Sequence, residues 1–324
     1  MEQEEKLSLI NGRIHTQTSI ASNITFEHGR IASIDDEISS MNGKIMDLHG
    51  RTVLPGFCDT GIDFLAWAEG QERLNLGNVR SSKELSMALG TYSRANPKPL
   101  RGWYIGYNLP DEVIISREDI DSVIPELPCA ITDARNSHVV LNTPAMSAFN
   151  MPQDNVEFEE FSQHLPDLSE DDILHLVKIY APKINALGIT ELWANFSGDA
   201  SRLWGILFND AYNMLTFRLR CCMEFGGVNP LNEFLASGLR TGDGLPFCKL
   251  GGIIVKGDLE QQEQKNMIYS AHLSGCQIIS DNNKSCLNAL ERVIKRAKKN
   301  SRHVVRGMSQ GLLDRMRMLG LGGI

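Results

Sequence analysis

Between residues 7 and 54, short segments of alternating apolar and polar residues are separated by turn pairs such as Asn11-Gly12 and His28-Gly29. Alternation with a period of two predicts β-strands that bury one face, and such pairs favour the tight turns that join them. The pattern therefore predicts a small N-terminal β unit of the sandwich type over residues 1–54.

From residue 55 onward, short apolar runs bounded by glycine or proline alternate with segments of helical periodicity. This alternation is typical of successive βα units around a parallel sheet. The predicted strands cover residues 56–64, 103–107, 129–133, 190–194, 216–223, 252–256, 277–280 and 303–306. We predict an α/β fold in which residues 55–324 form a TIM-like (β/α) barrel, incomplete or distorted, with some of these strands in insertions outside the barrel wall.

Three serines stand at the predicted starts of helices. Ser82 and Ser116 each precede a run of helix-forming residues, and Ser169 is followed by Asp172 in the spacing of a capping box. Serine side chains at such positions accept hydrogen bonds from the first free N–H groups of a helix. We interpret these serines as helix caps and not as nucleophiles.

The composition is that of an ordinary globular protein, with 42% hydrophobic and 22% charged residues among 324. The net charge of -8 has the wrong sign for a protein that binds phosphate backbones, so we expect no nucleic-acid partner. The basic run Lys295-Arg296-Ala-Lys298-Lys299 ends a predicted helix, where cations interact favourably with the helix dipole.

The expected location follows from what the sequence does not contain. No apolar stretch approaches the length of a membrane span, and the start Met1-Glu-Gln-Glu-Glu is acidic where a secretory signal is basic. The seven cysteines are scattered without the spacing of a metal site, and we interpret them as buried free thiols. We therefore expect a cytoplasmic protein with no membrane partner.

An ordered series of short motifs runs through the chain after residue 50. It includes Leu54-Pro-Gly-Phe-Cys-Asp59, Gly102-Trp-Tyr-Ile-Gly106, Ser137-His138-Val-Val-Leu-Asn142, Val255-Lys256 and Ala271-His272-Leu-Ser-Gly275. This series resembles the amidohydrolase superfamily, and in particular its "amidohydrolase 3" branch of metal-dependent carbon–nitrogen hydrolases. The resemblance implies a barrel whose reacting groups lie at the carboxyl ends of the strands.

The resemblance also implies a metal site, because these hydrolases use one or two divalent ions, usually zinc, to activate a bound water. The positions of the ligands fall on Gly61, Asp63, Lys256, Ser280 and Gly307. Glycine offers no side-chain donor, and Arg306 would bring a positive charge to a cation site. The last ligand of the family, an aspartate, would fall beyond Ile324.

Lys256 corresponds to a lysine that the family carboxylates to bridge two metals. The alternative interpretation is an ordinary ion pair with Asp258, Asp281 or Glu260, and we favour it because a carbamate needs two metals to hold it.

Our leading hypothesis is a degenerate hydrolase, or pseudoenzyme, that binds no metal or other cofactor. It would retain a pocket for a small molecule or a partner. The candidate pocket residues are Asp59, Trp67, His138 and Asn142.

Two alternatives remain open. A working hydrolase of non-peptide carbon–nitrogen bonds could hold zinc at a remodelled site that uses Asp63 and Lys256. A structural subunit could instead form a homo-oligomer that covers an incomplete barrel. A nucleophilic thiol at Cys221 or Cys222 is disfavoured by the neighbouring Glu224, which would raise the pKa of a thiol.

Overall fold

The computed structural model describes residues 6–35, 43–150, 153–281, 284–296, 303–307 and 322–323. It divides into two compact units, Met1–Cys58 and Asp59–Ile324. Lys298 and Lys299 of the basic run and the segment 297–302 lie outside the described residues.

The first unit contains two small sheets. One has the strand order β5-β4-β1-β6 and the other the order β3-β2-β7. Residues Ile14, Ala21, Ile24 and Leu48 come from both sheets and form one buried cluster, which is the packing of a sandwich. The bounds are β1 (Leu7–Ile10), β2 (Arg13–His15), β3 (Ile20–Ala21), β4 (Ile24–Glu27), β5 (Arg30–Ile34), β6 (Lys44–Asp47) and β7 (Thr52–Val53).

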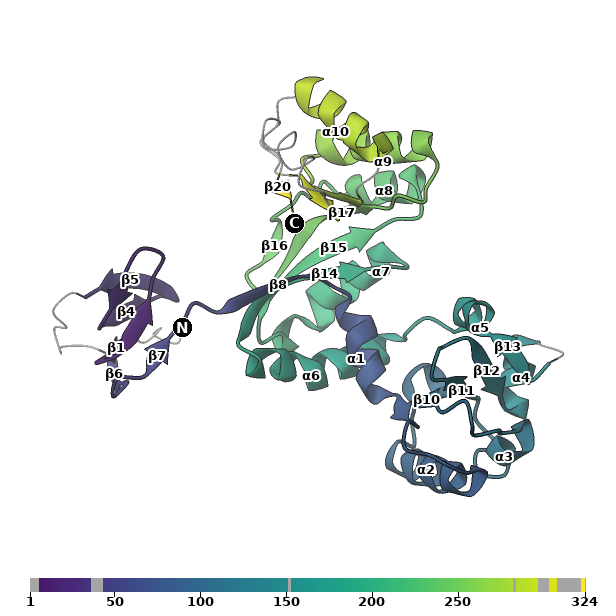
Figure 1. The fold of residues 1–324 in the computed structure, drawn as a ribbon. Coiled ribbons are helices and arrows are strands. Elements are labelled where there is room, and N and C mark those ends of the chain that lie inside the picture. The colour runs from purple at the N-terminus through teal and green to yellow at the C-terminus, as the bar shows by residue number, and fades with distance from the viewer. Residues whose placement is uncertain are drawn as a thin grey trace. The chain divides into compact units, whose positions relative to one another are not determined.

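The main sheet of the second unit is a curled half-barrel with the strand order β20-β19-β18-β17-β15-β14-β8 (Figure 1). Its strands are β8 (Phe57–Ile62), β14 (Ile189–Phe196), β15 (Arg218–Glu224), β17 (Cys248–Val255), β18 (Ile278–Asp281), β19 (Val304–Arg306) and β20 (Gly322–Gly323), and the short β16 (Gly244–Leu245) pairs antiparallel with β17. The pairings from β14 through β20 are parallel. An incomplete TIM-like barrel was predicted, and the sheet confirms it.

Helices cover one face of this sheet, and their buried side chains form the largest core cluster of the protein. They are α1 (Phe64–Glu72), α6 (Glu170–Ala186), α7 (Ala200–Gly205), α8 (Val228–Leu235), α9 (Gln261–Leu273) and α10 (Lys284–Arg296), with a π-helical turn at Ile206–Asp210 and a 3-10 turn at Tyr212–Met214. We call this the outer face. The inner face carries a smaller apolar cluster of Cys222, Ile254 and Ile279, against which Trp193 and Val304 pack.

A second sheet lies between α1 and α6 in the sequence. Its strand order is β13-β12-β11-β10-β9, and it includes the predicted strands 103–107 and 129–133, which therefore stand outside the barrel wall. The elements are β9 (Leu74–Asn75), α2 (Ser82–Ala95), a 3-10 turn (Leu100–Gly102), β10 (Tyr104–Leu109), α3 (Arg117–Asp121), β11 (Cys129–Asp133), β12 (His138–Leu141), α4 (Thr143–Phe149), β13 (Asn155–Glu157) and α5 (Phe158–His164).

The helix starts follow the serine signals closely. Ser116 and Ser169 each form a complete capping box at α3 and α6. At α2 the cap is Ser81 instead of Ser82, because Ser82 already has helical geometry and the Ser81 hydroxyl accepts from the Glu84 N–H. Within the described part of the chain, no helix combines the length and the apolar character that crossing a membrane requires.

Candidate functional site

The carboxyl ends of the main sheet gather polar side chains on its inner face. In the parallel register, Asn195 of β14 lies opposite Cys222 of β15, and Glu224 lies opposite Ile254 of β17. Because paired residues of a sheet share a face, Asn195 and Glu224 lie on the same face as the inner apolar cluster.

The neighbouring strands extend this polar edge. Asp281 of β18 lies opposite Arg306 of β19, one residue beyond Ser280 and Val305. Val305 is part of the outer core cluster, so Asp281 and Arg306 lie on the inner face.

Hydrogen bonds and one ion pair join these groups. The Lys256 Nζ lies 2.8 Å from Glu224 Oε1. Arg306 Nη2 donates to Asn195 Oδ1 at 2.6 Å, and Asn195 Nδ2 donates to the Gly61 carbonyl at 2.9 Å. Asp281 Oδ2 accepts from the Gly257 N–H at 2.9 Å. The edge is therefore held by contacts within the protein.

The ion pair determines the charge state of Lys256. The hydrogen bond to Glu224 raises the pKa of the Lys256 ammonium, although partial burial acts in the opposite direction. A protonated amine has no lone pair with which to form a carbamate or ligate a metal. Lys256 thus forms the ion pair that was favoured from the sequence, but its partner is Glu224 and not Asp258, Asp281 or Glu260.

The inner face also contains a concave pocket of about 500 Å³. Trp193, Cys222, Ile279 and Val304 supply apolar wall atoms, and Asn195 and Arg306 supply polar atoms. This pocket was not predicted from the sequence. The alternation along β14 and β19 could have indicated the pocket, because it places residues two apart on one face of the sheet.

Comparison with known proteins identifies the fold. Neither protein-family models nor curated proteins match the chain. Among solved structures, it is similar to an uncharacterized metal-dependent hydrolase from Pyrococcus furiosus, with 16% identity and a TM-score of 0.80 over 98% of this chain and 76% of that one. The chain has an amidohydrolase fold. The resemblance found in the sequence is thereby confirmed at the level of the fold.

Two further structures agree with this amidohydrolase fold. An uncharacterized metal-dependent hydrolase from Pyrococcus horikoshii OT3 is 16% identical, with a TM-score of 0.77 over 98% of this chain and 74% of that one. A triazine hydrolase from Arthobacter aurescens is 9% identical, with a TM-score of 0.53 over 99% of this chain and 65% of that one. The chain thus spans less than two thirds of the triazine hydrolase.

The positions that the resemblance assigned to metal ligands occupy different environments. Gly61 offers its carbonyl, which Asn195 already uses, and Gly307 has a positive φ of 70° after β19. Asp63 caps α1, where its carboxylate accepts from the Ala66 N–H at 2.9 Å. Ser280 pairs with Val255 and Val305 and so lies on the outer face.

These residues do not fit a catalytic zinc ion, which takes three protein ligands and a water. Throughout the described ranges, no three His, Cys, Asp or Glu side chains are arranged to hold a metal. The charged side chains at this edge are two cations, Lys256 and Arg306, which cannot ligate a metal, and carboxylates such as Glu224 that already have partners. The donor chemistry therefore disagrees with the metal site that the fold family implies.

His138 lies in β12 of the second sheet, and Asn142 follows that strand, so neither residue belongs to the strands of the half-barrel. Asn142 is fully buried and caps α4. His138 is exposed and lies 3.8 Å from Glu157 across the neighbouring strand.

The other two candidate pocket residues lie at or after β8. Asp59 is a half-buried residue within that strand. Trp67 lies on α1, where its ring packs edge-on against Tyr180 of α6 with centroids 5.6 Å apart. Neither residue is among those that line the concave pocket.

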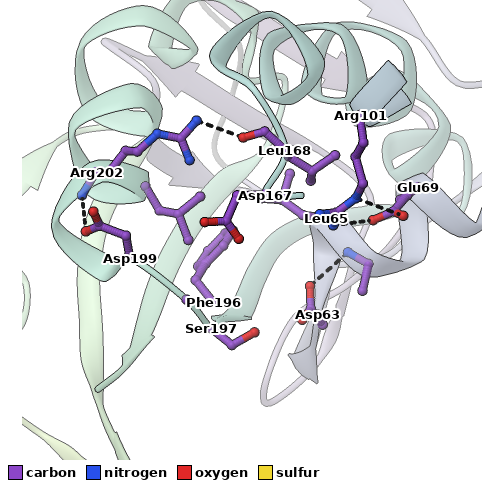
Figure 2. Close-up of a pocket in the computed structure, with 13 residues that line it drawn as sticks. Asp63, Leu65, Glu69, Arg101, Asp167, Leu168, Phe196, Ser197, Asp199 and Arg202 are labelled. Atoms are coloured by element: carbon purple, nitrogen blue, oxygen red, sulfur yellow. Dashed lines mark hydrogen bonds and ion pairs between the residues drawn. The ribbon is translucent and has the colours of Figure 1, made fainter. Parts of the chain in front are cut away.

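A second pocket of about 150 Å³ lies beside Asp63 (Figure 2). Most of its charged side chains have partners in the protein. Glu69 Oε2 pairs with Arg101 at 2.9 Å, Arg202 donates to the Leu168 carbonyl at 2.7 Å, and Asp199 caps α7. These contacts join α1 and α7 to the segments that precede β10 and α6. Burial raises the pKa of Asp63, and the nearby carboxylates of Glu69 and Glu224 add to this rise, although the hydrogen bond from the Ala66 N–H acts in the opposite direction.

The thiols offer no nucleophile at this edge. Burial raises the pKa of Cys222 to about 12, although the Arg306 charge acts in the opposite direction. Cys221 is fully buried beside Cys248, with 3.8 Å between the two sulfur atoms. Six of the seven cysteines are buried as predicted, whereas Cys58 is exposed.

Proposed function

We propose that this protein is an amidohydrolase-fold binding protein that does not carry out metal-dependent hydrolysis and that takes up a small organic anion in its concave pocket. The observation that carries the proposal is the Arg306 guanidinium, which lines the pocket beside Gly307, a position where the resemblance implies a metal ligand. Lys256 pairs with Glu224, and Arg306 reaches into the pocket from β19. Among the described residues that line the pocket, Arg306 is the charged one, and its positive charge opposes a divalent cation there and favours an anion.

Arg306 supports the choice of ligand. Its guanidinium is half-buried and donates to the neutral amide of Asn195, and no ion pair involves it among the described residues. A guanidinium in apolar surroundings binds a carboxylate in a bidentate geometry that lysine cannot offer. The proposed ligand therefore carries a carboxylate.

The walls of the pocket support the shape of the ligand. Trp193, Ile279 and Val304 line it with apolar atoms. An aromatic wall favours a flat apolar body, whose burial contributes about 25 cal/mol for each Å² removed from water. A planar carboxylate such as 2-naphthoate has both features and serves as a probe.

The binding experiment uses isothermal titration with 2-naphthoate and with its neutral analogue naphthalene-2-carboxamide. We expect the carboxylate to bind more tightly, and Arg306→Gln to weaken its binding by about 10- to 100-fold, since a charged hydrogen bond contributes about 1.5–3 kcal/mol. Arg218→Gln, at the exposed amino end of β15, is the matched control and should bind as the wild type does. Equal binding by Arg306→Gln would contradict the proposal.

The metal experiment separates the proposal from a remodelled hydrolase. The purified chain is incubated with zinc, dialysed and analysed for bound metal. We expect no stoichiometric zinc, because Lys256 is held as an ammonium by Glu224. Stoichiometric zinc that Lys256→Ala releases would establish the remodelled site instead.

A further inference from the structure

A groove of about 420 Å³ lies between α9 and α10, two helices that lie side by side (Figure 1). Lys265 of α9 and Lys284, Arg292 and Arg296 of α10 supply its charges. No carboxylate is among the described residues that line it. This concentration of positive charge contrasts with the net charge of -8 of the whole chain.

The charges of α10 form a stripe. Lys284, Arg292 and Arg296 are separated by multiples of four residues, so they lie on one side of the helix. Arg292 and Arg296 are four residues apart, and like charges at this spacing destabilise a helix by a few tenths of a kcal/mol. The neighbouring Lys295 is neutralised by Glu291 at 2.8 Å, whereas the cations of the groove form no ion pair within the described part of the chain.

The floor of the groove is apolar. Ala289 and Val293 of α10 are each 5% exposed, and Tyr269 of α9 forms part of the wall with 49% of its surface exposed. Apolar surface between charged rims is typical of grooves that receive one face of an amphipathic peptide.

We propose that the α9–α10 groove is a docking site for an acidic amphipathic segment of a partner protein. Carboxylates of the segment would pair with Lys265, Arg292 and Arg296, and its apolar side chains would cover the exposed ring of Tyr269. Nucleic acid fits less well, because a phosphate backbone offers no apolar group to the Tyr269 side and is repelled by the acidic remainder of the chain. This site is independent of the concave pocket on the inner face.

The test measures fluorescence anisotropy with the full chain and a short fluorescein-labelled peptide of repeated Glu-Glu-Leu units. We expect saturable binding that weakens as salt is raised to about 0.3 M, because exposed ion pairs are screened. The same peptide with lysine in place of glutamate should not bind. Binding of both peptides, or of neither, would overturn the proposal.

Variants locate the binding. The double substitution Lys265→Glu and Arg292→Glu should weaken the acidic peptide by about tenfold or more, since like-charge contacts at an interface cost several kcal/mol. The matched control is Lys83→Glu with Lys178→Glu, which makes the same change in net charge at exposed positions of α2 and α6. An equal loss in the control would show an effect of net charge alone and would overturn the site.

Two further measurements test the partner class. Tyr269→Ala should weaken the acidic peptide by about threefold, because apolar contact area is lost. An oligothymidylate of the same charge as the peptide should bind more weakly than the peptide. Tighter binding of the oligothymidylate, with no effect of Tyr269→Ala, would show a nucleic-acid surface and would overturn the assignment to a protein segment.

Discussion

Asn142 shows at the residue scale how a motif can have a structural role. Its Oδ1 accepts from the N–H groups of Cys129 at 2.8 Å and Ala145 at 3.0 Å. Its Nδ2 donates to the carbonyls of Ile124 at 2.8 Å and Leu127 at 3.0 Å. One fully buried amide thus satisfies four backbone groups and joins β11, α4 and the segment after α3.

We expect Asn142→Ala to lower the free energy of unfolding by about 2–4 kcal/mol, because it leaves several buried backbone groups without partners. His138→Ala, in the same motif but exposed, should change it by less than about 0.5 kcal/mol. Urea denaturation of both variants measures the difference. Similar values for the two would contradict the role assigned to Asn142.

His272 and His303 form a buried pair between α9 and β19. His303 Nε2 lies 2.8 Å from His272 Nδ1, and His303 Nδ1 accepts from the Ile278 N–H at 3.0 Å. That acceptor role places the His303 proton on Nε2, which therefore donates to His272. Burial, with a smaller contribution from the His272 charge, lowers the pKa of His303 to about 4.

This lowered pKa predicts a loss of stability in acid. Below about pH 6.5 the unfolded chain takes up a proton on His303 that the folded chain does not accept until about pH 4. The free energy of unfolding should therefore fall as the pH drops through this window, by up to about 3 kcal/mol in all. His303→Asn should show a smaller fall in urea denaturation at pH 7 and pH 4.5. An unchanged fall would exclude His303 as its source.

At the scale of elements, Asp63 is the single residue between β8 and α1, and it forms the N-cap of α1. Its carboxylate accepts from the Ala66 N–H, the usual hydrogen bond of an N-cap. The same residue stood at a metal-ligand position in the sequence-based mapping. The two roles differ in the charge that they require of the side chain. A cap needs only an oxygen that accepts a hydrogen bond, whereas the metal-ligand role needs a charged carboxylate.

Substitution at Asp63 distinguishes these roles. Asp63→Ala should lower the free energy of unfolding by about 1 kcal/mol, the usual cost of a lost cap. Asp63→Asn should be neutral or stabilising at pH 7, since asparagine caps equally well and the raised pKa shows that the folded site disfavours the charge. Thermal or urea unfolding gives both values. A loss from Asp63→Asn as large as that from Asp63→Ala would contradict the capping role.

At the scale of the whole molecule, the two units have separate cores. Ile14 is 2% exposed in the cluster of the first unit, while the core of the second lies between the main sheet and its helices. Separate cores allow separate local unfolding.

We expect Ile14→Ala to destabilise the first unit by about 2–4 kcal/mol, the range for large-to-small core substitutions. Hydrogen exchange followed by mass spectrometry should show faster exchange in β1 to β7 and unchanged exchange in β14 to β19. Faster exchange throughout the chain would show that the two units unfold together.

Local signals in the sequence predicted the elements well. The runs at 190–194, 216–223, 252–256 and 277–280 are strands, and Ser116 and Ser169 cap helices. These features depend on interactions within a few residues, namely side-chain alternation and capping hydrogen bonds. The ordered motifs also led to the amidohydrolase fold, which solved structures confirm.

The site depended on contacts that no local pattern contains. The resemblance assigned Ser280 to a metal-ligand position. Its pairing with Val305 instead puts Ser280 on the outer face of the sheet and leaves Asp281 on the inner face. The sequence also offered three partners for Lys256, none of which was Glu224. The sequence alone thus determined the elements, whereas tertiary structure decided which side chains meet, because a shift of one residue in strand register moves a side chain to the opposite face of the sheet.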